Sequence, residues 1–199
     1  MASWAEFEKD RPDLAAAGRA LLYQFGVGLG FLATVRLDGG PRVHPMCPVI
    51  HDGGMYAFIV PGPKQADLHR DGRYALHSFP CEDNEDAFYC TGRASAEADA
   101  GLRQTLAGIF VAERAGSVPV PEPAQHLFRF SVDRGLLTRT TGHGDMAPQH
   151  TTWQDPAGPS GPPAPHSHRP PSCRCGPARR RMARQGGRAT LGGEAVCPA

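Results

Sequence analysis

Lysine is almost absent from this sequence. Lys9 and Lys64 are the only lysines among 21 basic residues, and all the others are arginines. No run of apolar residues approaches the roughly 20 needed to span a bilayer, so the sequence predicts no transmembrane helix. It also has no Cys-x-x-Cys pair and no secretory signal. We therefore expect its six cysteines to be reduced thiols in a cytoplasmic protein.

The sequence matches neither of two common enzyme motifs, the glycine-rich turn that binds a dinucleotide and the nucleophile elbow of hydrolases. Gly26, Gly28 and Gly30 follow a predicted helix and precede a predicted strand, which is the reverse of the order in a dinucleotide-binding turn. Their spacing, Gly-x-Gly-x-Gly, also differs from the fingerprint of such turns. No nucleophile elbow supports a Ser/His/Asp hydrolase. Both enzyme classes are excluded, and we interpret the glycine segment as a flexible connector.

The composition changes near Asp155. Residues 1–154 hold every aromatic residue and an excess of acidic over basic side chains, whereas residues 155–199 carry seven arginines and two acidic residues. The second segment consists mainly of Ala, Gly, Pro and Arg, which bury too little apolar area to offset the entropy of ordering. We expect a folded domain over 1–154 and a disordered tail over 155–199.

Other interpretations of the tail remain open. Its four main residue types use GC-rich codons, so the segment could be out-of-frame sequence, which only the coding DNA can decide. The basic run 179–181 suits an acidic partner surface, but no stacking aromatics accompany it, and we do not expect nucleic-acid binding. His166, His168, Cys173 and Cys175 have metal-binding donors, yet nothing around them would fix a coordination geometry.

The first 154 residues predict helices at the start and then a succession of strands. Ser3 and Glu6 form a capping-box pattern, and Pro12 suits the first turn of a second helix. Strands with short turns are predicted at 31–37, 42–50, 55–60, 73–79, 87–95 and 126–138. A further amphipathic helix is predicted over 99–115. Such hairpin-connected strands favour a mainly β (α+β) fold, a six-stranded antiparallel β-barrel with flanking helices.

Lys64 lies where a predicted strand gives way to a short helix, after the turn Pro61-Gly62-Pro63. The first N–H groups of a helix and its dipole already favour an anion, and a lone lysine there suits a phosphate. A solvated lysine at a helix start is the alternative.

Residues 31–97 resemble the pyridoxamine-phosphate-oxidase-related, FMN-binding split-barrel family. The order and spacing of several motifs carry the resemblance: Leu32-Ala-Thr-Val-x-x-Asp38-Gly, Arg42-Val-His-Pro45, Gly54-Met-Tyr, Lys64 with Asp67-Leu68, and Asp71-x-Arg73-x-x-Leu76. The resemblance implies a split barrel that forms a homodimer with a flavin in each groove between the subunits. It also implies an oxidoreductase that transfers a hydride to or from an unidentified small molecule.

The resemblance further implies which residues bind the cofactor. Its phosphate would be held by the Lys64 loop and the second strand, and its ring would lie against the third and fourth strands, with a C-terminal tryptophan reaching towards it. The candidates are Arg42, Val43, His44, Phe58, Ile59, Lys64, Gln65, His77, Ser78 and Trp153. For His77 and Trp153, simple packing roles are the alternatives. No acid–base pair stands out, so the catalytic residues are unknown.

Gly62-Pro63-Lys64 differs from the Ser-x-Lys common in this family. The hydroxyl donor is missing and Pro63 has no N–H, so the deazaflavin F420, with a similar ring and a longer tail, is an alternative cofactor. A non-catalytic flavin- or haem-binding protein is a second alternative, and an interaction module acting through its basic tail is a third. The C-terminal part of the chain lacks the Arg-x-His that grips pyridoxamine phosphate in the true oxidases, so we do not expect a true pyridoxamine-phosphate oxidase.

Overall fold

The computed structural model describes residues 1–158. The helices are α1 (Trp4–Asp10), α2 (Pro12–Leu22), α3 (Pro63–Arg70) and α4 (Ala100–Ala112). The strands are β1 (Gly30–Val35), β2 (Pro41–Met46), β3 (Val49–His51), β4 (Gly54–Ile59), β5 (Arg73–Ser78), β6 (Ala87–Ala96), β7 (His126–Arg139) and β8 (Gln149–Gln154). The basic run and the histidine and cysteine residues of the tail lie outside the described residues, as does nearly all of the segment predicted to be disordered.

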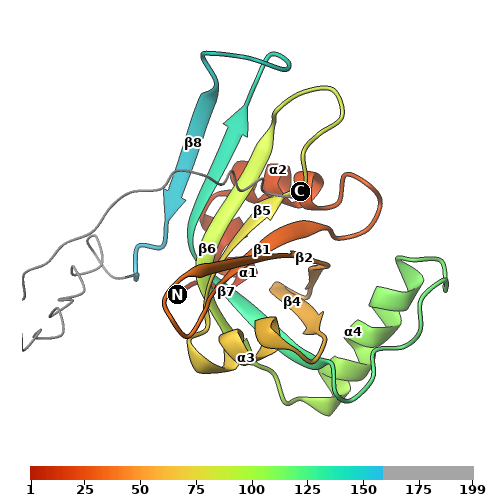
Figure 1. Cartoon of the computed structure of the whole chain (residues 1–199). Coiled ribbons are helices and arrows are strands. Elements are labelled where there is room, and N and C mark those ends of the chain that lie inside the picture. The colour runs from red at the N-terminus through yellow and green to blue at the C-terminus, as the bar shows by residue number, and fades with distance from the viewer. Residues whose placement is uncertain (159–199) are drawn as a thin grey trace, which may run out of the picture. The chain divides into compact units, whose positions relative to one another are not determined.

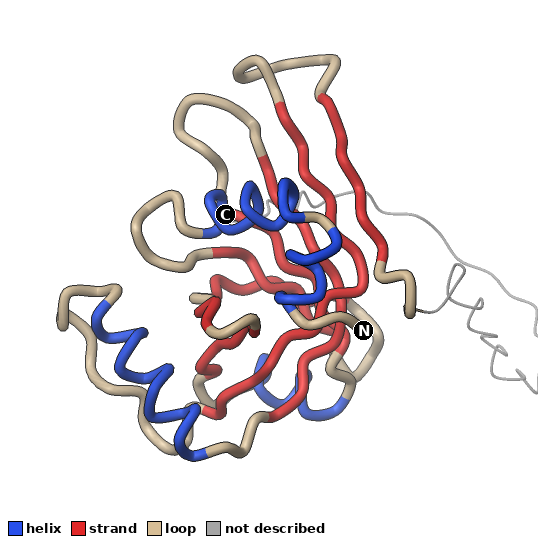
Figure 2. The backbone as a smooth tube through the Cα atoms, turned by 180° about the vertical axis from the view of Figure 1, so that it is seen from behind, coloured by secondary structure: helices blue, strands red, loops and turns tan. Residues whose placement is uncertain are grey.

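The eight strands form one antiparallel sheet in the order β2-β1-β5-β6-β7-β4-β3, and β8 pairs with the far end of β7. The sheet curls into a half-barrel (Figure 1). Seen from behind, α1 and α2 lie against one face of it, whereas α4 lies beside β3 (Figure 2). The predicted antiparallel, mainly β fold with flanking helices is confirmed. Among the described residues no helix has the length and apolar character to cross a membrane.

The prediction of six strands was wrong in two places. Residues 42–50 form two strands instead of one, because Pro48 cannot donate to a ladder and restricts the preceding Cys47. After this break β3 pairs only with β4, at the opposite edge of the sheet from β2. The second difference is an additional strand: residues 149–154, which lie outside the six predicted ranges, form β8, with Trp153 opposite Gly135 of β7.

The N-terminal helices form as predicted and close one end of the core. The Ser3 hydroxyl accepts a hydrogen bond from the Glu6 amide, and the Glu6 carboxylate accepts one from the Ser3 amide at 2.6 Å. These bonds complete the capping box. Pro12 is the first residue of α2, as predicted.

Phe88 on β6 is the centre of an aromatic cluster that joins these helices to the sheet. Its ring lies 6.1 Å from that of Trp4 and 6.3 Å from that of Phe7, centroid to centroid. Gly18 of α2 lets the helix approach this ring, since a Cβ at that position would lie 2.7 Å from it. Trp4, Phe7 and Phe88 are all buried.

Phe88→Ala should therefore lower the free energy of unfolding by about 3–5 kcal/mol, the usual loss for a buried phenylalanine. Urea denaturation measures this change. Phe25→Ala is the matched control, since Phe25 is 52% exposed and its removal should change stability by less than about 0.5 kcal/mol. Equal losses in the two variants would contradict the assignment of the core.

Candidate functional site

Helix α3 begins with unsatisfied backbone donors. Its N-cap is Gly62, whose φ of 147° suits glycine alone, and no side chain caps the helix. Pro63, the first helical residue, has no N–H to donate. The amides of Lys64 and Gln65 come next in this uncapped first turn, so both are available to an anion.

The Lys64 side chain folds back over the end of β2. Its Nζ donates to the carbonyl oxygen of Pro45 at 3.1 Å, which uses one of its three protons. No carboxylate of the described residues forms an ion pair with it. Burial lowers the pKa of this ammonium below its ordinary value of 10.5. An anion arriving here would therefore meet a partly dehydrated cation with donors to spare.

His44 on β2 contributes a second unsatisfied group. The side chain is half-buried, and its Nε2 is buried without a hydrogen-bond partner among the described residues. A buried ring nitrogen without a partner costs free energy unless a ligand or water satisfies it. His44 and Pro45 are neighbours, so the strand that carries this nitrogen also carries the carbonyl that holds Lys64.

Asp67 organises the charges of this corner. Its carboxylate is 4% exposed and accepts hydrogen bonds from Arg42 Nε at 2.8 Å, Thr34 Oγ1 at 3.1 Å and Arg70 Nη1 at 3.1 Å. Burial works to raise the pKa of Asp67, but these three donors outweigh it and lower the pKa below its ordinary value of 3.8. Lys64 lies on the same helix, so Arg42, Arg70 and Lys64 together carry three positive charges and Asp67 one negative charge. The corner therefore keeps a net positive charge.

Sequence reasoning assigned Arg42 to a phosphate and missed what it pairs with. In the structure Arg42 forms an ion pair with Asp67, and Arg70 also reaches the carbonyl oxygen of Val35. Asp67 was visible as part of a family motif, whereas Arg70 was not, and only the fold brings β1, β2 and α3 together.

The outer face of the sheet carries an uncharged row of residues, with Arg73, Arg93 and Arg134 further along the same strands. The register aligns Phe31, His77, Tyr89 and Leu136 across four neighbouring strands. The Phe31 ring also stacks on Phe79 at 4.3 Å between centroids. Two residues further along β1 and β5 on the same face, Ala33 and Ala75 take part with Arg73 in lining a hollow of about 260 Å³.

His77 and Ser78 point to opposite faces of β5. The Ser78 carbonyl can only accept, so Nδ1 of the exposed His77 is the donor to it, at 2.6 Å, and Nε2 of the neutral ring is left with a lone pair. Ser78 is buried, and its hydroxyl accepts from the Phe88 amide at 3.1 Å. Only His77 is therefore accessible from the outer face.

The side chains of the remaining predicted residues make other contacts or are exposed. Val43 is 60% exposed on the edge strand, whereas Ile59 is fully buried. Gln65 ties α3 to the chain around it, with Nε2 donating to the Ile59 carbonyl at 2.8 Å and the Ala124 carbonyl at 2.9 Å. Phe58 packs against Phe110 of α4.

Trp153 is held by α1. Its ring lies 4.8 Å from that of Phe7, and its indole N–H donates to the Asp10 carboxylate. These contacts match the anchoring role given above as the alternative to a cofactor contact.

No group of three potential metal ligands occurs within residues 1–158. Cys47, Cys81 and Cys90 are free thiols, as expected for the described cysteines.

No protein-family model matches the sequence, and no curated protein is similar to it at a significant level. Among solved structures, a heme-binding protein from Mycobacterium smegmatis matches with a TM-score of 0.52 at 17% identity. The match covers 69% of this chain and 57% of that one, so this chain spans little more than half of the mycobacterial protein. HupZ of group A Streptococcus matches with a TM-score of 0.50 at 16% identity, over 66% of this chain and 97% of the other.

The described domain has the split-barrel fold. A putative pyridoxamine 5'-phosphate oxidase from Listeria innocua also matches, more weakly, with a TM-score of 0.47 at 18% identity, over 59% of this chain and 91% of that chain. At identities this low, the similarity to these structures shows the architecture alone. The fold implied by the motifs of residues 31–97 is confirmed, and the activity has to be argued from the residues of the barrel itself.

Asp67→Asn should lower the free energy of unfolding at neutral pH by about 1.5–3 kcal/mol, because it removes the negative charge that pairs with Arg42 and Arg70. The pKa of Asp67 is lowered on folding, so its contribution is complete above about pH 4 and is lost as the pH falls through the folded pKa. The unfolding free energy of the variant should thus fall less steeply than that of the wild type below about pH 4.

Denaturant titrations at several pH values test this expectation. Asp38→Asn is the control, because the Arg36–Asp38 pair is 48% and 60% exposed and should contribute less than about 1 kcal/mol. Parallel pH profiles for wild type and Asp67→Asn would contradict the role assigned to Asp67.

Proposed function

We propose that this protein is a flavin-dependent oxidoreductase that binds FMN with its phosphate at the Lys64 corner. The observation that carries the proposal is a set of polar groups without partners at the start of α3 and on β2. Two amides in the uncapped first turn of α3, the Lys64 ammonium and the buried Nε2 of His44 all lack anionic partners among the described residues. A phosphate, with several acceptor oxygens, suits such a donor set.

Positive charge at the corner supports a phosphate over a neutral acceptor. Asp67 neutralises one of its two arginines, and Lys64 has no acidic partner in the described domain. The carboxylate also fixes the guanidinium of Arg42, so this charge is held in place before a ligand arrives. The hydroxyl that Ser-x-Lys would supply is missing, and here the two amides and His44 take over part of its role.

The ring of the cofactor would lie along the outer face of the sheet. The row from Phe31 through His77 to Tyr89 is uncharged and partly aromatic, which suits a planar ring. When bound, the flavin would supply hydride transfer, and the protein would orient it and exclude water. F420 remains the alternative, since its ring is similar and its tail is longer.

A second copy of the chain would complete the groove. Phe31 is 37% exposed and Val43 is 60% exposed, both at the β1–β2 edge beside the proposed phosphate site. Covering this apolar edge in a homodimer would close the site over the ring. The free thiols Cys47, Cys81 and Cys90 fit our proposal of a reducing, cytoplasmic location.

Lys64→Ala should weaken FMN binding by about 1.5–3 kcal/mol, or roughly 10- to 150-fold, the scale of a hydrogen bond to a charged group. Fluorescence quenching of FMN on titration with protein gives the affinity. Lys9→Ala is the matched control, since Lys9 is the other lysine of the chain and is exposed on α1. A protein that binds neither FMN nor F420 would overturn the proposal, and unchanged affinity in Lys64→Ala would remove the phosphate from this corner.

Haem is a second candidate cofactor, and His77 is the observation that favours it. A histidine that donates Nδ1–H to a backbone carbonyl presents Nε2 as a ligand, the usual arrangement at metal sites. Phe31, Phe79 and Tyr89 surround it with apolar surface. The solved structure from Mycobacterium smegmatis with the same fold is described as a heme-binding protein.

If haem is the ligand, His77→Ala should change the position of the Soret band and weaken binding by at least roughly tenfold, since an axial nitrogen is lost. His143→Ala, at a 59% exposed loop histidine, is the control and should keep the wild-type spectrum. Identical Soret bands in wild type and His77→Ala would exclude His77 as the ligand.

A further inference from the structure

Helix α4 is apolar on two sides. Leu106 packs with Val49, Tyr56 and Leu127 in the smaller of the two core clusters, which is the side that faces the sheet. The other side carries Ala107, Val111 and further small residues, and Arg103 is the only charged residue of the helix. A helix with apolar residues on two sides is usually buried on both, yet α4 lies at the periphery of the domain (Figure 1).

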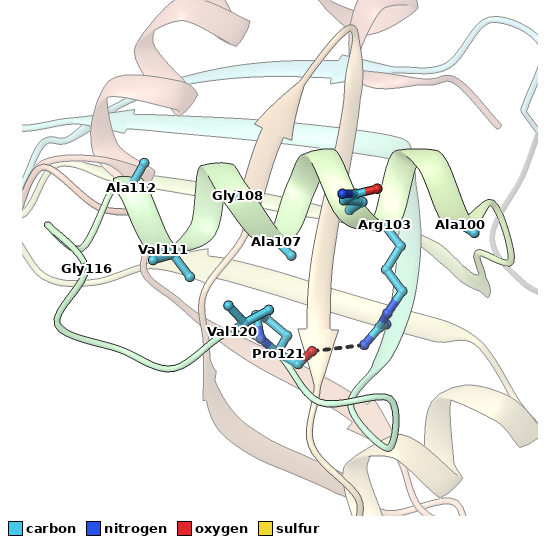
Figure 3. Close-up of a pocket in the computed structure, with 10 residues that line it drawn as sticks. Ala100, Arg103, Ala107, Gly108, Val111, Ala112, Gly116, Val120 and Pro121 are labelled. Carbon is cyan, nitrogen blue, oxygen red and sulfur yellow. Dashed lines mark hydrogen bonds between the residues drawn. The ribbon is translucent and has the colours of Figure 1, made fainter.

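A hollow of about 720 Å³ lies between this second side and the loop that follows the helix. Ala107 and Val111 point towards the part of the loop that carries Val120 and Pro121 (Figure 3). The volume is within the range of small-molecule sites, and the lining is predominantly apolar. The lining residues are Ala100, Arg103, Gln104, Ala107, Gly108, Val111, Ala112, Gly116, Val120 and Pro121.

Arg103 places one positive charge at an end of this hollow. Its guanidinium donates to the carbonyl oxygens of Glu122 at 2.7 Å, Gln125 at 2.9 Å and Pro121 at 3.4 Å. It also lies 5.1 Å from the centroid of the Phe58 ring. No carboxylate of the described residues forms an ion pair with it. The loop therefore fixes the position of Arg103 and leaves its charge uncompensated.

We propose that the hollow binds an amphipathic carboxylate, with the apolar part between α4 and Val120 and the carboxylate paired with Arg103. Charge complementarity selects the anion, because the single cation of an otherwise apolar site has only neutral partners. The volume of the hollow is that of a small-molecule site, which favours a small ligand over a second protein. This inference does not depend on the bound flavin.

Calorimetric titration of the full chain with decanoate tests the proposal, with decanol and decyltrimethylammonium as probes of equal chain length. All are used below the concentration at which they form micelles. We expect saturable 1:1 binding of decanoate, and binding at least about tenfold weaker for the two probes that lack a negative charge. No saturable binding of decanoate, or equal binding of decanol, would overturn the proposal.

Gly108→Leu blocks the hollow without disturbing the fold. A Cβ at Gly108 meets nothing within 4 Å, and replacing glycine in a helix favours the helix. Decanoate affinity should fall at least about tenfold. Thr105→Leu is the matched control, because Thr105 is exposed on the same helix and does not line the hollow. Equal affinities in the two variants would overturn the site.

Arg103→Lys and Arg103→Gln separate the charge from the loop contacts. Both replace the guanidinium with a shorter group that cannot make its hydrogen bonds to the loop carbonyls, and only lysine keeps the charge. Decanoate should bind the glutamine variant at least about tenfold more weakly than the lysine variant, whereas decanol should bind both alike. Equal decanoate binding would refute the ion pair.

Light scattering of Gly108→Leu is the last check. A molar mass different from that of the wild type would show that this face is an interface between copies of the chain, and would refute the ligand site.

Discussion

The buried carboxylate of Asp67 is the interaction on which the candidate site depends. It accepts hydrogen bonds from Thr34 of β1, Arg42 of β2 and Arg70 of its own helix, α3. Thr34 is 33 residues and Arg42 is 25 residues before Asp67 in the sequence. A buried charge is tolerated only when it is paired and hydrogen-bonded, so Asp67 holds the two arginines as much as they hold it. Lys64 lies one helical turn before Asp67 and shares this anchored frame.

The sheet determines where that frame is exposed. Pro48 ends pairing after β2, and the chain then crosses to the other edge, so β2 is left as an edge strand next to α3. An edge strand offers unpaired groups and accessible side chains. This explains why His44 and the carbonyl of Pro45 are both within the candidate site. The same break that refuted the prediction of one long strand thus creates the corner.

The domain has two apolar surfaces, of which one packs in the core and the other is only partly covered. The aromatic cluster around Phe88 closes the core and also holds Trp153 through Phe7, which leaves that tryptophan away from the Lys64 corner. Helix α4 covers only the smaller cluster and keeps a second apolar side beside its own loop. Its one arginine faces that side with neutral partners, and the proposed binding site follows from this unequal coverage.

Local chemistry explains what the sequence could predict. The capping box at Ser3 and Glu6, the position of Pro12, the turns around the hairpins and the uncapped start of α3 depend on neighbouring residues, and all were visible in the amino-acid order. The motifs of residues 31–97 also predicted the split barrel. Contacts between distant segments needed the tertiary structure. Asp67 pairs with Arg42 across 25 residues, and Trp153 reaches Asp10 across 143, and no local pattern encodes either partner. The reason is physical: side chains of opposite charge or matching shape meet only where the curl of the sheet brings them together.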